Sequence, residues 1–250
     1  MGRFVSFAQD GNTLTVYGST LDDYQKIWKR YLDIERDYDA VASDILSRCE
    51  NTALAEAIDY GRGIRILSQD PFECIISFII SQNNNIPRIK KIIEALSAKC
   101  GNPVEMSQEL KKHSSGASSL CSFPDAEALR ALGVEGLFEL KTGFRAKYIY
   151  DAVSRTLDGS LSIEEILLES DIERAIDMLC EVKGIGRKVA SCALLFGFGR
   201  YNAFPVDVWM KRVALKYFPE DGENLSWEKF GPYAGIAQQY LFYYERYRSI

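Results

Sequence analysis

The chain has 250 residues, of which 47% are hydrophobic and 26% charged, and its net charge is −5 at neutral pH. This length and composition are typical of one or two globular domains with a sizeable core, and they exclude disorder, collagen and coiled coil as the main architecture. The acidic balance argues against a nucleic-acid binder that works by bulk charge alone, although it permits a locally basic face.

The six cysteines are scattered, no two of them lie three positions apart, and the chain has one histidine. Zinc sites need closely spaced cysteine and histidine ligands, so we expect no zinc site. We find no secretion signal and no apolar run that approaches the ~18 residues of a membrane span. We therefore expect reduced thiols, no membrane partner, and a location in the cytoplasm or, in a eukaryote, the nucleus.

The first predicted element is a β-hairpin over residues 3–17, because Val5 and Phe7 alternate with polar neighbours and Asp10-Gly11 supplies a turn. After Gly18 the pattern becomes helical, beginning with a helix over residues 21–37. A helix over 52–60 follows, and another starts at Pro71, capped by Asp70, and ends before residues 81–85. A helix over 86–100 precedes a polar, Ser-rich loop at 102–123.

The remaining predicted helices cover residues 125–132, 134–141, 145–157, 162–168, 171–182, 187–196, 207–217 and 231–247. These elements predict a mainly α protein with a small N-terminal antiparallel β piece.

The join at residues 183–186 is the most informative feature, because Gly184 and Gly186 flank the single apolar residue Ile185. Glycine allows close backbone approach to another molecule, and the free N–H groups of the helix that follows can hold a phosphate. From spacing alone, a tight helix–helix turn with glycine for geometry explains the pattern equally well.

Local charge favours the phosphate interpretation. Between Lys183 and Lys216 the only acidic residue is Asp207, whereas seven residues are basic: Lys183, Arg187, Lys188, Arg200, Lys211, Arg212 and Lys216. A local phosphate-binding surface explains this asymmetry in a chain that is acidic overall.

Lys188 and Asp207 are the candidate catalytic pair. Lys188 falls in the first turn of a predicted helix, where the helix dipole disfavours a cation and so favours the neutral, nucleophilic amine. Asp207 follows Pro205 and Val206 and suits the N-cap of the next helix, a role compatible with catalysis.

Four segments together resemble the helix-hairpin-helix (HhH-GPD) DNA glycosylase superfamily, and within it the 8-oxoguanine DNA glycosylase/AP lyases. The segments are residues 69–88, 143–148, 182–192 with 205–208, and 230–238. The resemblance implies two helical subdomains, one from residues 38–84 with 197–250 and one from 85–196, with the helix-hairpin-helix at 171–196. Residues 1–37 would be the remnant of an N-terminal β-containing domain.

For the chemistry, the resemblance implies that Lys188 attacks C1′ of the damaged nucleotide while Asp207 stabilises the positive charge that develops on the sugar. The resulting Schiff base permits β-elimination, which nicks the strand without a metal or other cofactor. The implied partner is double-stranded DNA that contains 8-oxoguanine opposite cytosine, or an abasic site, bound by a monomer. The iron–sulfur cluster of related branches is not expected, since no cysteine follows Cys192.

The resemblance also assigns binding residues. Cys192 and Phe242 would sandwich the flipped base while Gln238 bonds its pairing edge. The orphaned cytosine and the wedge that fills its space would involve Asn83, Arg88, Phe144 and Arg145. Contacts to DNA phosphate would come from Gly184, Gly186, Arg187 and Trp209. The backbone carbonyls of Cys180, Val182 and Ile185 would hold a monovalent cation.

The chain departs from the family pattern in three places. Trp209 stands where animal members have His, and Phe144 stands where Tyr is usual. The N-terminal Gly-Gln-Cys-Phe-Arg-Trp-like motif, whose backbone distinguishes 8-oxoguanine from guanine, is not found, as though the chain began at the last hairpin of that sheet. Two alternatives therefore stay open: a related glycosylase/lyase that acts on another damaged base, and a non-catalytic helix-hairpin-helix DNA-binding module.

Overall fold

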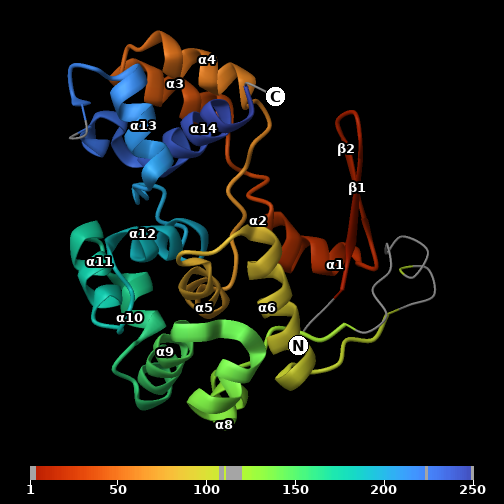
Figure 1. Ribbon diagram of the computed structural model, residues 1–250. Coiled ribbons are helices and arrows are strands. Elements are labelled where there is room, and N and C mark those ends of the chain that lie inside the picture. The colour runs from red at the N-terminus through yellow and green to blue at the C-terminus, as the bar shows by residue number, and fades with distance from the viewer. Residues whose placement is uncertain (1–3, 107–109, 111–119, 223–224, 249–250) are drawn as a thin grey trace. The chain divides into compact units, whose positions relative to one another are not determined.

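The computed structural model describes residues 4–106, 110, 120–222 and 225–248, and these residues are mostly helical with one two-stranded antiparallel sheet (Figure 1). The chain divides into two compact units. Unit 1 comprises residues 1–30, 79–161 and 182–184, and unit 2 comprises residues 31–78, 162–181 and 185–250. The mainly α fold class is thus confirmed, while the domain boundaries expected from the sequence stay a prediction.

The N-terminal hairpin of unit 1 consists of β1 (Ser6–Asp10) and β2 (Thr13–Tyr17), and Gly11 takes the positive φ of its turn. The helical segment that follows begins with α1 (Leu21–Asp23), where the Thr20 side chain accepts from the backbone N–H of Asp23. This segment continues as η1 (Tyr24–Trp28), and the Trp28 ring meets the ring of Phe7 edge-on at 5.8 Å. The hairpin is therefore anchored on an aromatic contact.

The other helices of unit 1 are α6 (Ile86–Cys100), α8 (Ala126–Leu137), η2 (Phe138–Thr142), η3 (Gly143–Arg145) and α9 (Ala146–Asp158). The Asn85 side chain caps α6 by accepting from the N–H of Arg88, as expected for Asn before a helix. The predicted break near residue 133 is confirmed, because Gly133 has a φ of +64° and kinks α8. α8 packs on α9 (Figure 1).

Unit 2 contains α3 (Tyr38–Arg48), α4 (Thr52–Tyr60), most of α5 (Pro71–Ser81), α10 (Ile163–Leu168), α11 (Ile172–Cys180), α12 (Arg187–Phe196), α13 (Val208–Tyr217), η5 (Trp227–Tyr233) and α14 (Ala234–Tyr247). α14 packs against α4 and α13, α3 packs against η5, and α11 packs against α12 (Figure 1). Fully buried Ile45, Leu54 and Phe230 fill the core among these helices.

The predicted helix over 21–37 is too long, because after α2 (Lys29–Tyr31) the chain turns. Asp33 takes a φ of +49°, and its carboxylate accepts from Arg36 at 2.7 Å and from the hydroxyl of Tyr38 at 3.0 Å. Asp37 then caps α3, which the sequence pattern did not predict.

Two other predicted helix bounds are wrong. α14 begins at Ala234 rather than at residue 231, because Gly231 has a φ of +65° and Pro232 follows it. α11 ends at Cys180 rather than at residue 182.

Part of the predicted loop at 102–123 and part of the hairpin lie outside the described residues, namely 107–109, 111–119 and residue 3. Within the described part, Pro103 pairs with Cys121 in an isolated bridge. No helix of the described residues combines the length and the apolar character that crossing a membrane requires.

Candidate active site

The candidate nucleophile sits at the start of a buried helix. Gly186 is the N-cap of α12 and offers no side-chain cap, and no acidic residue lies in the first turn. Lys188 is exposed in this turn, whereas Val189 through Leu195 are buried. The spacing of Lys188, Cys192 and Phe196 places them on one face of the helix.

This face opens into a pocket of about 190 Å³ within unit 2. The pocket is lined by Lys188, Cys192, Phe196, Pro205, Asp207, Gln238, Gln239 and Phe242. The two predicted catalytic residues and the three predicted base-pocket residues are thus brought together by three helices that are far apart in the chain.

Asp207 is held by the helix that it caps. Its Oδ1 accepts from the backbone N–H groups of Trp209 and Met210, both at 2.9 Å, at the start of α13. The helix N-terminus stabilises the negative charge of this carboxylate. Within the described chain Oδ2 has no hydrogen bond, so one oxygen positions the group while the other is available to a ligand.

Two of the base-pocket residues, Cys192 and Gln238, are buried, and Phe242 is half-buried. Burial raises the pKa of the Cys192 thiol above its usual value, and the nearby Lys188 opposes this shift. Gln238 is only 3% exposed, and its amide oxygen accepts from Gln239 at 2.5 Å. Phe242 lies one helical turn further along α14, with the Arg246 guanidinium 5.7 Å from its ring centre. The pocket wall therefore presents a neutral thiol, an amide and an aromatic ring.

The two hairpin glycines have different environments. Gly184 has a φ of +83°, and a Cβ there would lie 2.3 Å from the Tyr148 ring. No atom of the described residues lies within 4 Å of a Cβ added at Gly186, so its backbone is open on this side to another molecule. The first glycine serves the turn, whereas the second leaves room for a ligand such as phosphate.

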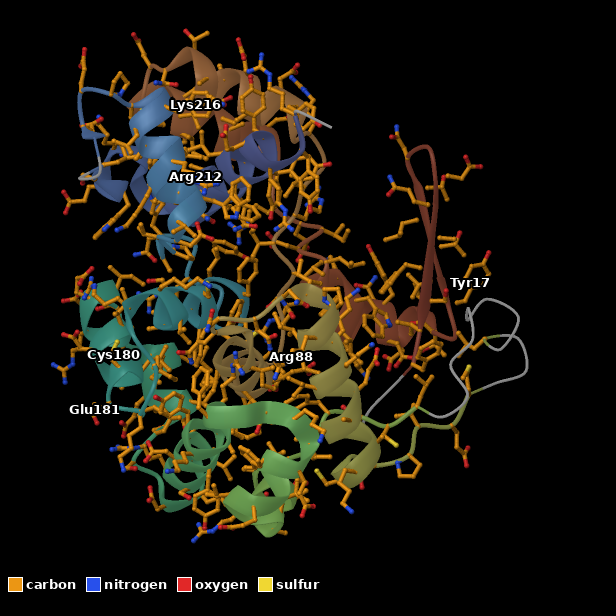
Figure 2. All side chains as sticks on the ribbon, in the orientation of Figure 1. Tyr17, Arg88, Cys180, Glu181, Arg212 and Lys216 are labelled. Carbon is orange, nitrogen blue, oxygen red and sulfur yellow. The ribbon has the colours of Figure 1, made fainter. Side chains whose placement is uncertain are left out.

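The other predicted phosphate contacts already have protein partners. Arg187 pairs with Glu173, and its guanidinium lies 4.0 Å from Asp177 of α11. The Arg212 guanidinium lies 5.1 Å from the centre of the Trp209 ring. Figure 2 shows Arg212 on α13. Both remain predictions, and the N–H groups at the start of α12, where Gly186 gives no side-chain cap, are the other candidate donors for a phosphate.

The predicted orphan-base residues lie in unit 1. Arg145 is 3% exposed, and its Nε donates to the carbonyl of Gln82 at 2.8 Å, Nη1 to Thr142 at 3.1 Å and Nη2 to Asn83 at 3.0 Å. Nη2 also donates to Gln82, so one N–H on Nη1 remains for a ligand. Arg145 therefore fixes the turn in which Asn83 takes a φ of +46°.

Two further residues of unit 1 face solvent. Phe144 is 54% exposed, and its ring meets Tyr148 edge-on at 5.9 Å, so an apolar ring projects next to Arg145. Arg88 is exposed at the start of α6, where Figure 2 labels it. An exposed ring and an exposed guanidinium suit the predicted wedge and base-reading roles, which stay predictions.

No group of three or more His, Cys, Asp or Glu side chains that could hold a metal occurs among the described residues. The predicted cation ligands are backbone carbonyls instead. Among the described loop hydrogen bonds, none is accepted by the carbonyls of Cys180, Val182 or Ile185. These oxygens keep the lone pairs that a monovalent cation requires.

Phe196, Pro205 and Gln239 also line the pocket and were not predicted from the sequence. Phe78 was not predicted either; its ring centre lies 5.8 Å from the Lys188 Nζ, and it stacks on Phe196. Phe196 follows Cys192 by one helical turn, and this spacing is the signal that would have identified it. The contact of Phe78 joins residues 110 positions apart and leaves no such signal.

Comparison with known proteins gives the family. Residues 76–226 match the family model of HhH-GPD superfamily base excision DNA repair proteins, and residues 1–75 match that of the 8-oxoguanine DNA glycosylase N-terminal domain. The N-glycosylase/DNA lyase OGG1 of Arabidopsis thaliana is 33% identical over 197 residues, which cover 72% of this chain and 52% of the relative. The chain thus spans about half the length of that relative.

Two other relatives are matched over most of their length. The probable N-glycosylase/DNA lyase of Methanothermobacter thermautotrophicus is 30% identical over 252 residues, 90% of this chain and 77% of that protein. The Clostridium acetobutylicum 8-oxoguanine glycosylase/lyase, solved with double-stranded DNA containing cytosine opposite 8-oxoguanine, superposes with a TM-score of 0.85 at 35% identity. That match covers 98% of this chain and 82% of the other. The chain therefore belongs to the HhH-GPD superfamily of base excision DNA repair proteins.

Proposed function

We propose that this chain removes 8-oxoguanine that lies opposite cytosine in duplex DNA and then nicks the strand as an AP lyase. The observation that carries the proposal is the single pocket that joins Lys188 and Asp207 with Cys192, Gln238 and Phe242. The bifunctional activity named for the relatives in plants, archaea and Clostridium supports it. All five residues come from one unit of one chain, which supports a monomer.

The pocket residues suit a flipped purine. The Phe242 ring and the Cys192 thiol offer apolar faces, and the Gln238 amide offers a donor and an acceptor to the pairing edge. Burial raises the pKa of the Cys192 thiol, so this residue adds no negative charge next to an electron-rich base. The thiol, the aromatic ring and the amide would therefore hold the base by stacking and hydrogen bonding.

The chemistry begins at the amine of Lys188. Its Nζ bonds to C1′ as the bond between C1′ and the base nitrogen breaks, and the base leaves with that electron pair and takes up a proton. The amine gives a proton to the departing base, and the C1′–O4′ bond then breaks as O4′ keeps the electron pair and takes up a proton, which leaves a protonated Schiff base between Nζ and C1′. Loss of a C2′ proton expels the 3′ phosphate, and hydrolysis frees the lysine.

Asp207 acts by charge. The sugar becomes cationic as the base departs, and a fixed carboxylate beside it stabilises that state more than the ground state. Because α13 already holds Oδ1, little reorganisation of the carboxylate accompanies the reaction. The same helix contact that orders Asp207 thus prepares it for catalysis.

The remaining residues would hold the duplex. The N–H groups at Gly186 and the start of α12 would bind phosphate, and Gly184, Arg187 and Trp209 are the further phosphate contacts that we propose. A monovalent cation on the carbonyls of Cys180, Val182 and Ile185 would add positive charge for phosphate. Phe144 would fill the space of the extruded nucleotide, while Asn83, Arg88 and the remaining N–H of Arg145 would contact the orphaned cytosine.

The test is single-turnover release of 8-oxoguanine from a duplex with the lesion opposite each of the four bases. We expect release opposite cytosine by the native chain and none by Lys188→Gln. Lys229→Gln is the matched control, because Lys229 lies in the same unit, does not line the pocket and pairs with Asp221. Release of another damaged base in place of 8-oxoguanine, or binding without release, would overturn the proposal.

A further inference from the structure

A second pocket lies in unit 1, and the function proposed above gives it no role. Its volume is about 480 Å³, and it lies between α6 and η2. It is lined by Arg88, Lys91, Ile92, Ala95, Glu139, Leu140 and Lys141. The pocket therefore combines an apolar floor from Ile92, Ala95 and Leu140 with a charged rim.

The rim is positive and unneutralised. It carries three cations, Arg88, Lys91 and Lys141, against the single carboxylate of Glu139. Within the described part of the chain no carboxylate pairs with these three cations, whereas Arg187 on the hairpin pairs with Glu173. Arg88 also lowers the pKa of the Arg145 guanidinium, second to the effect of burial, which shows cations close together.

The backbone adds an independent observation. Lys141 has a φ of +67°, a conformation that glycine or asparagine adopts readily and that lysine rarely adopts. Such outliers concentrate at functional positions, because the surrounding structure has to hold them. The strained residue here is one of the cations on the pocket rim.

We propose that this pocket binds the sugar–phosphate backbone of the DNA strand opposite the lesion, with Lys91 and Lys141 as phosphate contacts. The proposal rests on the proposed function, because it extends the same DNA-binding surface. Deoxyribose presents an apolar face between successive phosphates, which matches an apolar floor within a cationic rim. Arg88 connects the two sites, since it lines this pocket and is also the predicted reader of the orphaned base on that strand.

An acidic peptide is the competing occupant of this pocket. Arg88, which lines the pocket and is also the predicted reader of the orphaned base, argues against it. A peptide in this pocket would cover Arg88 and so block the predicted contact to the orphaned base. A DNA strand engages Arg88 through its base and both lysines through its phosphates at the same time. The pocket and the predicted orphan-base site of unit 1 thus share Arg88, which Figure 2 marks.

The test measures duplex affinity against salt concentration in a non-incising Lys188→Gln background. The variants are Lys91→Gln, Lys141→Asn, which suits the positive φ, and the double substitution. We expect the slope of log K against log salt to fall by about one for each lysine, and affinity at moderate salt to fall roughly tenfold in the double variant. Lys90→Gln is the control, because Lys90 is exposed on α6 outside the pocket.

A second measurement identifies the strand. Replacing phosphates by neutral methylphosphonates in the strand opposite the lesion should abolish the difference in duplex affinity and salt slope between the double variant and its parent. The same replacement in the lesion strand should leave that difference unchanged. Slopes that match the Lys90→Gln control would overturn the proposal, as would an effect confined to the lesion strand. Absence of base release by the native chain would instead count against the proposed function. The failure of this proposal and the failure of the proposed function are therefore distinguishable.

Discussion

Asp207 shows how one side chain serves both stability and chemistry. Its Oδ1 caps α13 through two backbone N–H groups, and the charge on the same carboxylate faces the pocket with Lys188. Asparagine is also a good N-cap but carries no charge, so the two roles can be separated by substitution.

We expect Asp207→Asn to keep the free energy of unfolding within about 0.5 kcal/mol of the native value. Its single-turnover rate of base release should fall at least ~100-fold, because the cationic sugar loses its counter-charge. Asp207→Ala should lose the rate and also about 1 kcal/mol of stability. Urea unfolding and quenched-flow base release measure the two effects, and an Asn variant with native rate would contradict the assignment.

At the same scale, Arg145 shows where sequence reasoning stops. Its position in the resemblance predicts contact with the orphaned base, but the structure buries it against the carbonyls of Gln82, Asn83 and Thr142. The carbonyls of Gln82 and Asn83 are more than sixty positions from Arg145 in the sequence. No local sequence pattern encodes such a contact. Arg145 is first a positioning residue for Asn83.

At the scale of elements, capping residues made the best predictions. Asp70 caps α5 and Asp207 caps α13, both as predicted, because side chains that satisfy helix ends are readable locally. α3 was missed because Asp33 interrupts a continuous helical pattern through contacts with Arg36 and Tyr38. The pocket face of α12 was predicted in part, because Lys188 and Cys192 lie one helical turn apart, whereas the contact of Phe78 with Lys188 joins residues far apart in the chain.

The helix-hairpin-helix join yields a paired prediction. Gly184→Ala should cost about 2 kcal/mol or more, because a positive φ and the Tyr148 ring both oppose a Cβ. Gly186→Ala should leave stability within about 0.5 kcal/mol, because its φ is −103° and its Cβ meets no atom.

The effect of Gly186→Ala should instead appear in DNA binding, where we expect roughly tenfold weaker affinity because the methyl group obstructs a phosphate at the N–H groups of α12. Thermal unfolding and fluorescence anisotropy with an abasic-analogue duplex separate the two outcomes. Equal duplex affinity of Gly186→Ala and the native chain would remove the hairpin backbone from the DNA-binding surface.

At the scale of the whole molecule, global stability should depend on a buried thiol. Burial raises the pKa of Cys74 from its usual value of 9.0 to about 12, with further contributions from Glu73, Asp70 and Cys192. Above pH 9 the unfolded chain loses this proton while the folded chain keeps it, so the free energy of unfolding falls as pH rises toward 12.

Cys74→Ala removes this titration. Between pH 9 and pH 10.5 the native chain should lose about 1 to 2 kcal/mol more stability than the variant. Urea unfolding at several pH values measures the difference, and below pH 9 the two curves should run parallel. Parallel curves above pH 9 would show that Cys74 titrates in the folded protein as it does in the unfolded chain.

The most direct test of the whole account is borohydride trapping on a duplex that contains 8-oxoguanine opposite cytosine. The account predicts a covalent protein–DNA adduct whose attachment site, mapped by mass spectrometry, is Lys188, with none formed by Lys188→Gln. Adduct formation on an abasic duplex alone would show a lyase that does not release 8-oxoguanine. Absence of an adduct on both duplexes would contradict the assignment of Lys188 as nucleophile and leave a DNA-binding module without catalysis.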